Sequence, residues 1–283
     1  EGFTVMGTKW ALVLLTVLLL IKTTTSWANE IYISQVGDNL TLNITQEGEN
    51  HSITGLPFAT QGIEGDRNSI TIHQDGEEYH QVEGQIVGDD NTIDVYQGGG
   101  GKSNFASGQI IGDDNSLKVY QGKHENGTTD SIEAGDHTSY SVIIGDNNNM
   151  EVYQTDGATN CCTSAHFVGN VIYYGDDNDV KTVQQGNGGH YLQTETNGDD
   201  NTLDVLQRGS LNQHDGDIEL WGDNHIVDVQ QKDNGGHSIT LDLTNSGGAY
   251  NVNTLQEGAT AQTYSLIGVC TNVNGCAVSV TQN

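Results

Sequence analysis

Two stretches of the chain decide its fold: Gly88–Gln97 reads GDDNTIDVYQ and Gly112–Gln121 reads GDDNSLKVYQ. In the first stretch Ile93 and Val95 share one parity, whereas Asp94 lies on the other. A period of two predicts a β-strand with one buried face. The Gly-Asp-Asp-Asn before each strand indicates a turn, because Gly tolerates positive φ and Asp or Asn side chains hydrogen-bond their own backbone. Each stretch therefore predicts a turn followed by a strand.

The same unit recurs along the chain, with a Gln at the end of each strand. This column consists of Gln46, Gln74, Gln97, Gln121, Gln154, Gln184, Gln207 and Gln231, and weaker copies end at Gln256 and Gln282. A second, less regular strand follows each loop, for example at His80–Val82 and His190–Leu192. Two strands in a unit of roughly two dozen residues predict an all-β fold, namely a β-solenoid of about ten strand-turn-strand repeats.

Equivalent residues should then stack on rungs about 4.8 Å apart. Two residues before the Gln, the column reads Ile44, Ile72, Val95, Val119, Val152, Thr182, Val205 and Val229, which forms a thin aliphatic core. Three residues before it, the outward column reads Asp94, Lys118, Glu151, Lys181 and Asp204. Alternating charges in one column favour in-register stacking. The Asn at each strand start and the buried Gln are expected to form amide ladders between rungs.

Composition excludes several classes of protein. The chain has 283 residues, with 9 Lys and Arg against 38 Asp and Glu, so its formal net charge is −29. Binding of nucleic acid is not expected, because it requires clustered cations. Only 34% of the residues are hydrophobic, which favours an elongated shape with a thin interior over a globule with one large core.

The first 28 residues have the pattern of a secretory signal. Lys9 precedes the apolar run Trp10–Ile21, and small residues at Ser26 and Ala28 predict cleavage after Ala28. We therefore expect residues 1–28 to be upstream residues and a signal peptide, and residues 29–283 to form the secreted solenoid. Four Cys suit an oxidising compartment. Cys270 and Cys276 are the expected disulfide, while the pairing of the adjacent Cys161 and Cys162 stays open.

The repeat resembles the curlin repeat of curli amyloid subunits. The best match is the run Asn29-x-Ile31-x-Ile33-x-Gln35-x-Gly37. The Gln-x-Gly step recurs at Gln74, Gln97, Gln184, Gln207 and Gln256, whereas Lys123, Asp156 and Asp233 replace the Gly in three units. The loops are also longer than in the type family. The resemblance implies an extracellular, self-assembling fibre subunit that depends on an outer-surface secretion machinery.

One acidic residue per turn forms the candidate metal site, made of Asp89, Asp113, Asp146, Asp176, Asp199 and Asp223. Calcium bound between rungs would relieve the repulsion of such a column, since Ca²⁺ takes carboxylate oxygens. The alternative is that each Asp caps its own turn. No cofactor is required in either case. Several His, including His80, His190, His214 and His237, recur at equivalent places, where a transition-metal column competes with simple polar residues that open a strand.

No combination of nucleophile, base and acid stands out, and we expect no enzymatic activity. The first function expected is that of a structural subunit of an extracellular fibre, in a biofilm matrix or adhesive layer. The alternative is a monomeric secreted solenoid that binds calcium, ice or carbohydrate. Head-to-tail polymerisation would use the terminal strands, and the interface residues expected are Ile31, Ile33, Gln35, Val278, Val280 and Gln282.

Overall fold

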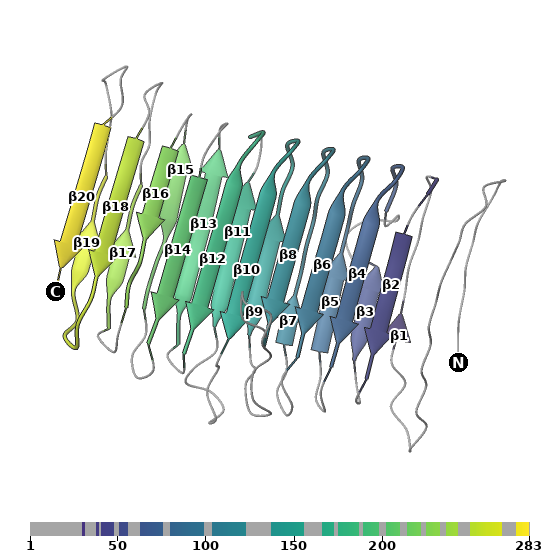
Figure 1. Ribbon diagram of the computed structural model, residues 1–283, viewed down its shortest axis with the longest axis horizontal. Coiled ribbons are helices and arrows are strands. Elements are labelled where there is room, and N and C mark those ends of the chain that lie inside the picture. Colours follow the sequence, from purple (N-terminus) through teal and green to yellow (C-terminus); the bar gives the residue numbers. More distant parts are fainter. Residues whose placement is uncertain are drawn as a thin grey trace.

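The computed structural model describes residues 30–31, 38–39, 41–47, 51–55, 63–75, 80–98, 104–122, 137–155, 166–172, 175–186, 189–197, 202–209, 214–221, 225–232, 236–242, 250–267 and 276–282. Every regular element in these residues is a β-strand (Figure 1). No helix among these residues is long and apolar enough to cross a membrane. The predicted signal peptide, Cys161, Cys162 and Cys270 lie outside the described residues.

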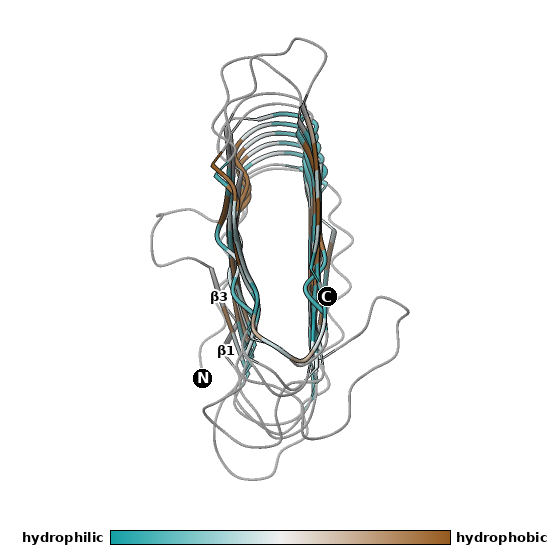
Figure 2. Ribbon diagram, turned by 90° about the vertical axis from the view of Figure 1, so that its left-hand side faces the viewer, coloured by the Kyte–Doolittle hydropathy of each residue, from teal (hydrophilic) through white to brown (hydrophobic). Residues whose placement is uncertain are grey.

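Successive strands alternate between two walls of one stack (Figures 1 and 2). The even-numbered strands form a ten-stranded sheet from β2 (Thr41–Gln46), β4 (Ser69–Gln74), β6 (Thr92–Gln97), β8 (Ser116–Gln121), β10 (Asn149–Thr155), β12 (Asp179–Gln185), β14 (Thr202–Arg208), β16 (His225–Val229), β18 (Tyr250–Gln256) and β20 (Cys276–Gln282).

The odd-numbered strands form the facing wall. An eight-stranded sheet contains β1 (Glu30–Ile31), β3 (Ser52–Gly55), β5 (His80–Gly84), β7 (Asn104–Ala106), β9 (Thr138–Val142), β11 (Phe167–Ile172), β13 (Tyr191–Asn197) and β15 (Ile218–Trp221). A two-stranded sheet follows it, made of β17 (Ser238–Thr240) and β19 (Thr263–Ser265). Each rung thus contains one odd and one even strand, and the predicted all-β solenoid is confirmed.

The strands pair in parallel, in the register that the repeat predicts. Ile93 pairs with Leu117, and Gln97 pairs with Gln121. On the outer face the charges alternate along one line of strand partners, which runs Asp94, Lys118, Glu151, Lys181 and Asp204. Inward residues such as Leu117 and Val152 are 0–1% exposed, so the aliphatic columns form the thin core between the walls.

In the described turns before the even strands, the positive φ falls on a different residue from the Gly that the sequence predicts. The residue with positive φ is Asp90 (55°) or Asp114 (56°), whereas the Gly at the turn start does not adopt this conformation. Short polar residues accept the left-handed region by bonding locally. The Gly is needed for a close approach instead. A Cβ on Gly88 would lie 2.3 Å from the carbonyl oxygen of Gly112 on the next rung.

Gly112→Ala should therefore destabilise the solenoid. The added Cβ would lie 2.3 Å from both the Gly145 carbonyl oxygen and Asp146 Oδ1, and the neighbouring rung must move to relieve the overlap. We expect the free energy of unfolding to fall by about 1–3 kcal/mol, measured by chemical denaturation. Gly84→Ala is the matched control, since its Cβ would meet no heavy atom within 4 Å. Equal stability of the two variants would contradict this account of the turn.

Candidate functional site

The polar side chains of the interior gather at the two edges of the flattened cross-section. At one edge an even strand ends in a buried Gln and the chain crosses to the next odd strand. At the other edge the chain returns through the Gly-Asp turn to a buried Asn. The aliphatic columns lie between them. These polar columns are the candidate site, because they repeat along the stack and connect one rung to the next.

The Gln ladder, defined by the buried Gln at the end of each even strand, runs along the stack axis. Gln97 Nε2 donates to Gln121 Oε1 at 2.8 Å, and Gln121 Nε2 donates to Gln154 Oε1 at 2.9 Å. The next contacts, Gln154 to Gln184 and Gln184 to Gln207, measure 3.2 and 2.9 Å. These residues are 0% exposed, so their amide groups depend on each other for hydrogen bonds.

Each Gln of this ladder also connects the two walls. The Nε2 atoms of Gln97, Gln121 and Gln154 donate to the backbone carbonyls of Gln81, Phe105 and Thr138 at 3.0, 2.8 and 3.0 Å. Those acceptors belong to the odd strand of the same rung. One amide therefore uses one N–H toward the next rung and the other toward the facing sheet. Neither an aliphatic residue nor an acid supplies both donors.

Gln154→Leu should be strongly destabilising. It removes the acceptor of Gln121 Nε2 and the donor for both Thr138 O and Gln184 Oε1 in a fully buried position. We expect a loss of about 2–4 kcal/mol in thermal or chemical unfolding, since each stranded buried group costs about 1–3 kcal/mol. The control is Gln193→Leu, on the exposed face of β13, which should change stability by less than about 0.5 kcal/mol. Similar losses in both variants would argue against the ladder.

The Asn ladder occupies the opposite edge. Asn91 Oδ1 accepts the backbone N–H of Asn115 at 2.8 Å, and Asn91 Nδ2 donates to the Gly112 carbonyl at 2.6 Å. The same two bonds recur from Asn68, Asn115 and Asn148 to the rung that follows each of them. On β16 the equivalent position is taken by the buried His225. Each Asn thus fixes the turn of its neighbour as well as its own strand.

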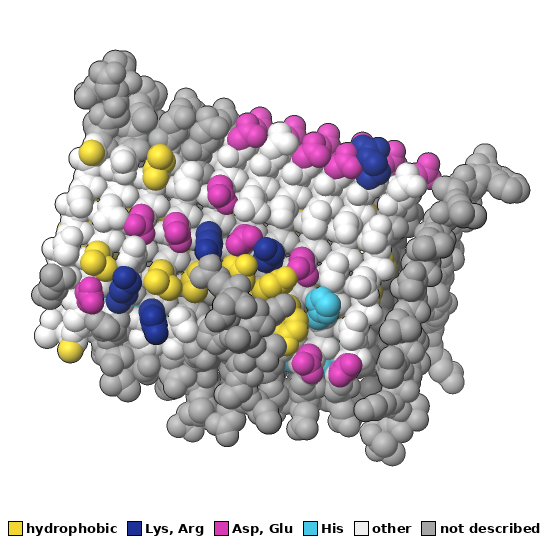
Figure 3. Space-filling view, viewed as in Figure 1, with side chains coloured by type: hydrophobic (Ala, Val, Ile, Leu, Met, Phe, Trp, Pro, Cys, Tyr) yellow, Lys and Arg dark blue, Asp and Glu magenta, His cyan; other side chains and the backbone are white. Residues whose placement is uncertain are grey.

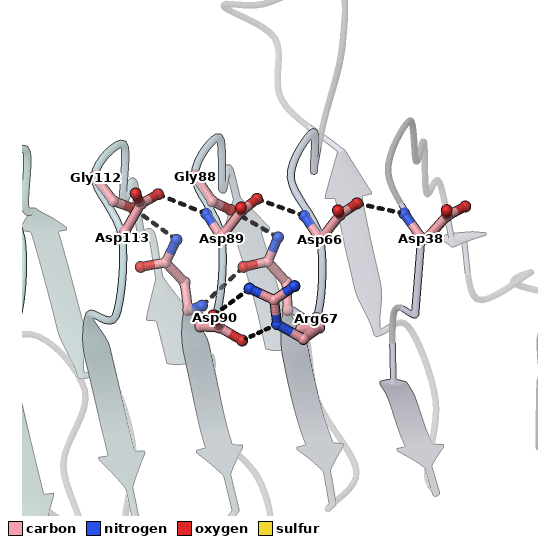
Figure 4. Close-up of polar contacts among 10 residues, drawn as sticks. Asp38, Asp66, Arg67, Gly88, Asp89, Asp90, Gly112 and Asp113 are labelled. Atoms are coloured by element: carbon pink, nitrogen blue, oxygen red, sulfur yellow. Dashed lines mark hydrogen bonds and ion pairs between the residues drawn. The ribbon is translucent and has the colours of Figure 1, made fainter.

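The Asp ladder runs beside it along the turns (Figure 4). The backbone N–H of Asp66 donates to Asp89 Oδ1 at 2.7 Å, and that of Asp89 donates to Asp113 Oδ1 at 2.7 Å. Asp146 and Asp176 continue the pattern, each at 2.8 Å. The carboxylates therefore cap the turn of the preceding rung, whereas the expected alternative placed each cap within its own turn. Parallel stacking brings a neighbour's N–H closer than any local donor.

A cation, Arg67, lies beside the Asp ladder. Arg67 donates from Nε and Nη2 to the two carboxylate oxygens of Asp90, at 2.7 and 2.6 Å (Figure 4). The guanidinium holds the pKa of the Asp90 carboxyl below its ordinary value. Both side chains are exposed, so the pair contributes little stability. Among the described residues, no three His, Cys, Asp or Glu converge to hold a metal ion. Asp199 and Asp223 of the predicted column lie outside those residues.

The stability of the acidic turns should not depend on a divalent cation. Adjacent carboxylates about 4.8 Å apart repel by about 1 kcal/mol in water, and each Oδ1 of the described Asp ladder receives a backbone N–H. We expect the midpoint of thermal unfolding to be the same with and without excess chelator at low ionic strength. A lower midpoint in chelator that added calcium restores would contradict this and would support cation binding between rungs.

A third buried column, the His column, lies next to the Gln ladder at the start of the odd strands. Its imidazoles are 0–1% exposed and belong to His51, His80, His137, His166, His190, His214 and His237. Neighbouring ring centroids lie 4.7–5.2 Å apart, from His51 to His80 and again from His137 through to His237. Asn104 occupies the gap between the two groups, since its N–H donates to His80 Nδ1 at 3.3 Å.

Only part of this column is visible in the sequence. The repeat is aligned on the Gln, but the segment from Gln to His differs in length, from Gln46–His51 to Gln121–His137. An alignment on the Gln therefore scatters the His residues. The signal that finds them lies two residues later, where each His is followed by a small or aliphatic buried residue, as His190 is followed by Leu192.

The outer face of the even sheet carries hydrophobic and charged side chains (Figure 3). Lys118 Nζ lies 2.8 Å from Glu151 Oε1, and Tyr120 Oη donates to Asp94 Oδ2 at 2.5 Å. Partial burial and Glu151 raise the pKa of Tyr153, which stacks edge-on against Tyr120 at 5.5 Å between ring centroids. The ion pair between Lys118 and Glu151 is partly exposed, so solvent screens its contribution to stability. The charges of this face are thus largely engaged with each other.

The described residues of the predicted polymer interface lie at the two ends of the stack. Val278, Val280 and Gln282 are on β20 and are partly exposed, although the same columns are buried in the middle of the stack. Gln256 Nε2 donates to Gln282 Oε1 at 2.7 Å. At the other end, Ile31 pairs with Ile53 through the backbone of β1 and β3. Ile33 and Gln35 lie outside the described residues, as does Cys270, the expected partner of Cys276.

Comparison with known proteins finds one related repeat. The family model described as the curlin associated repeat matches residues 198–232, which include β14, β15 and β16. The predicted resemblance to a curlin repeat is thereby confirmed for this segment. No curated protein and no solved structure matches the chain.

Proposed function

We propose that this chain is the structural subunit of a curli-like extracellular fibre and that it polymerises head to tail by stacking its end rungs. The observation that carries the proposal is the incomplete burial of the core at both ends. Leu42 and Ile44 on β2, and Val278 on β20, pack against the core but remain partly exposed. Interior residues of the same columns, such as Leu117 and Val119, are 0–1% exposed.

The two ends are complementary in residue type and register. In the repeat, Val278, Val280 and Gln282 on β20 correspond to Leu42, Ile44 and Gln46 on β2. A second copy placed beyond β20 would continue the aliphatic columns without a change of period. It would also continue the parallel pairing, because an edge strand offers a row of backbone donors and acceptors. Such an interface is heterologous, and it produces an open filament when its rotation does not close into a ring.

The Gln ladder gives this contact a direction. Where neighbouring Gln side chains bond to each other, Nε2 donates to the Oε1 of the following rung, as Gln46 does to Gln74 and Gln256 does to Gln282. At the proposed junction, Gln282 of one copy would donate to Gln46 of the next copy in the same sense. The wrong polarity would bring two donors or two acceptors together. The ladder therefore favours parallel addition of copies over head-to-head dimers.

The net charge supports thin fibres. A charge of −29 on each copy opposes lateral association, and salt screens this repulsion. The apolar run at residues 10–21 and the curlin-type repeat support secretion to the cell surface, with an outer-surface secretion machinery as the partner in export. A biofilm or adhesive layer is the setting that suits such a fibre. No substrate or cofactor has a role in this proposal.

The test places one charge on the end face. Val280→Asp introduces a carboxylate into the inward column of β20, where the next copy should bury it, and this burial is costly for an unpaired charge. We expect fibre growth, followed by light scattering and negative-stain microscopy, to slow by at least tenfold. Ser279→Asp is the matched control, because that exposed residue on the same strand points to the outer face. It should polymerise like the parent chain.

A mixing experiment separates blocked ends from damaged subunits. A Val280→Asp copy keeps its β2 end, so it should add to the β20 end of a growing fibre and stop it. Small amounts of this variant should therefore shorten fibres of the parent chain, whereas Ser279→Asp should not. Fibre growth at the parent rate by Val280→Asp would contradict stacking through the end rungs. A parent chain that forms no fibres and has a solution mass of one copy would instead support a monomeric binding solenoid.

A further inference from the structure

The His column carries an inference that does not depend on polymerisation. Seven imidazoles at 0–1% exposure form two stacked groups, with centroid spacings of 4.8 Å for His51 and His80 and of 4.7–5.2 Å from His137 to His237. Buried His occurs in many proteins, but each stacked group here places several titratable side chains side by side in the interior, away from water. The charge on one ring must then affect its neighbours.

The hydrogen bonds fix the protonation state of the rings. His51, His190 and His237 each approach, through Nε2, the backbone carbonyl of the chain that enters their own strand, at 2.9, 3.1 and 2.8 Å. A carbonyl oxygen only accepts, so Nε2 carries the hydrogen. Nδ1 of His190 and His237 is buried with no hydrogen-bond partner. A second proton on these rings would have no acceptor there.

Among the described residues, no carboxylate contributes to the electrostatic surroundings of His80 or His190. The titratable groups that face His190 are His166 and His214, with His137 beyond them, and His80 is faced by His51. The groups packed from the even strands are the uncharged amides of the Gln ladder, for example Gln184, which donates to the carbonyl of Phe167 directly after His166. The crossing chain presents the backbone carbonyls of Asp75 and Gln185.

Burial and the neighbouring imidazoles oppose the charged form of His80 and His190. Desolvation, followed by the effect of His51, lowers the pKa of His80 to about 4. Desolvation, followed by the effects of His166 and His214, lowers the pKa of His190 well below its ordinary value. In the unfolded chain these residues titrate near 6.5.

We propose that the His column is an acid-sensitive lock on the solenoid, which holds the starts of the odd strands when its rings are neutral and releases them when protons enter. The sign follows from linkage. At pH values well above about 6.5 these rings are neutral in both the folded and the unfolded state, and their contribution to stability is complete. Below it the unfolded chain takes up protons that the folded chain excludes, so the stability falls with falling pH down to the folded-state values.

The chain itself supplies the matched substitution. Asn104 and Gln262 occupy the same column position, and their amides make the bond that the imidazole makes elsewhere. Asn104 Nδ2 donates to the Gly98 carbonyl at 3.1 Å, and Gln262 Nε2 donates to the Glu257 carbonyl at 3.4 Å. His→Gln should therefore keep the bond to the carbonyl and remove the titration. His73→Gln, on the outward-pointing parity of β4, controls for the loss of a His elsewhere.

The experiment measures protons rather than stability alone. The unfolding free energy of the full chain is followed by denaturant titration at several values between pH 5 and 7, and its slope against pH gives the protons taken up on unfolding. We expect a slope of about two protons for the parent chain, from His80 and His190. His80→Gln and His190→Gln should each reduce it by about one proton, and the double variant by about two, whereas His73→Gln should leave the contribution of the column intact.

The outcomes are distinguishable. A slope that is unchanged in both single variants would overturn the proposal, even if their stability at pH 7 fell, because a purely structural His would lower stability equally at each pH. If the double variant did not fold, the two single variants would decide alone. Since unfolding is measured on dispersed copies, this result is independent of whether the chain forms fibres.

Discussion

The structure depends on the buried Gln amide that bonds in two directions at once. Along the stack it donates to the next Gln, and across the rung it donates to a backbone carbonyl of the facing sheet. A thin interior cannot rely on hydrophobic burial alone, because few apolar side chains separate the two walls. The amide therefore fixes three quantities together: the spacing of rungs, the register of the even strands and the distance between the sheets. Repetition makes each of these bonds support its neighbours.

The other polar columns follow the same rule with different partners. The Asn and Asp ladders use side-chain oxygens to accept backbone N–H groups of neighbouring turns, so the turn of one rung is completed by the next. The His column uses its Nε2–H to hold the chain that enters each odd strand. A rung is thus incomplete when isolated, as is typical of repeat proteins whose units are stabilised mainly by their neighbours.

This dependence connects fold and proposed function. The contacts that hold rung to rung inside the chain are the same contacts that a second copy would make at either end. In the proposed fibre, a strongly acidic surface would restrict growth to that axis, since the outer charges repel at long range and are paired locally, as in Lys118 with Glu151. The buried imidazoles add a dependence on acidity to a stack whose remaining ladders consist of neutral amides and ionised carboxylates.

The sequence by itself determined the even strands. A Gly and a Gln at constant separation fix parity and register, so the inward columns and the alternating charges of Asp94, Lys118 and Glu151 followed from counting residues. Only the tertiary structure decided the rest. Part of the His column escapes counting, because longer loops separate His137 and His166 from the preceding Gln, and folding brings them into line with the other members. The Gly of the turn and the direction of the Asp ladder were also decided there. Both depend on how closely a neighbouring rung approaches, and that distance is a property of the stack rather than of any single repeat.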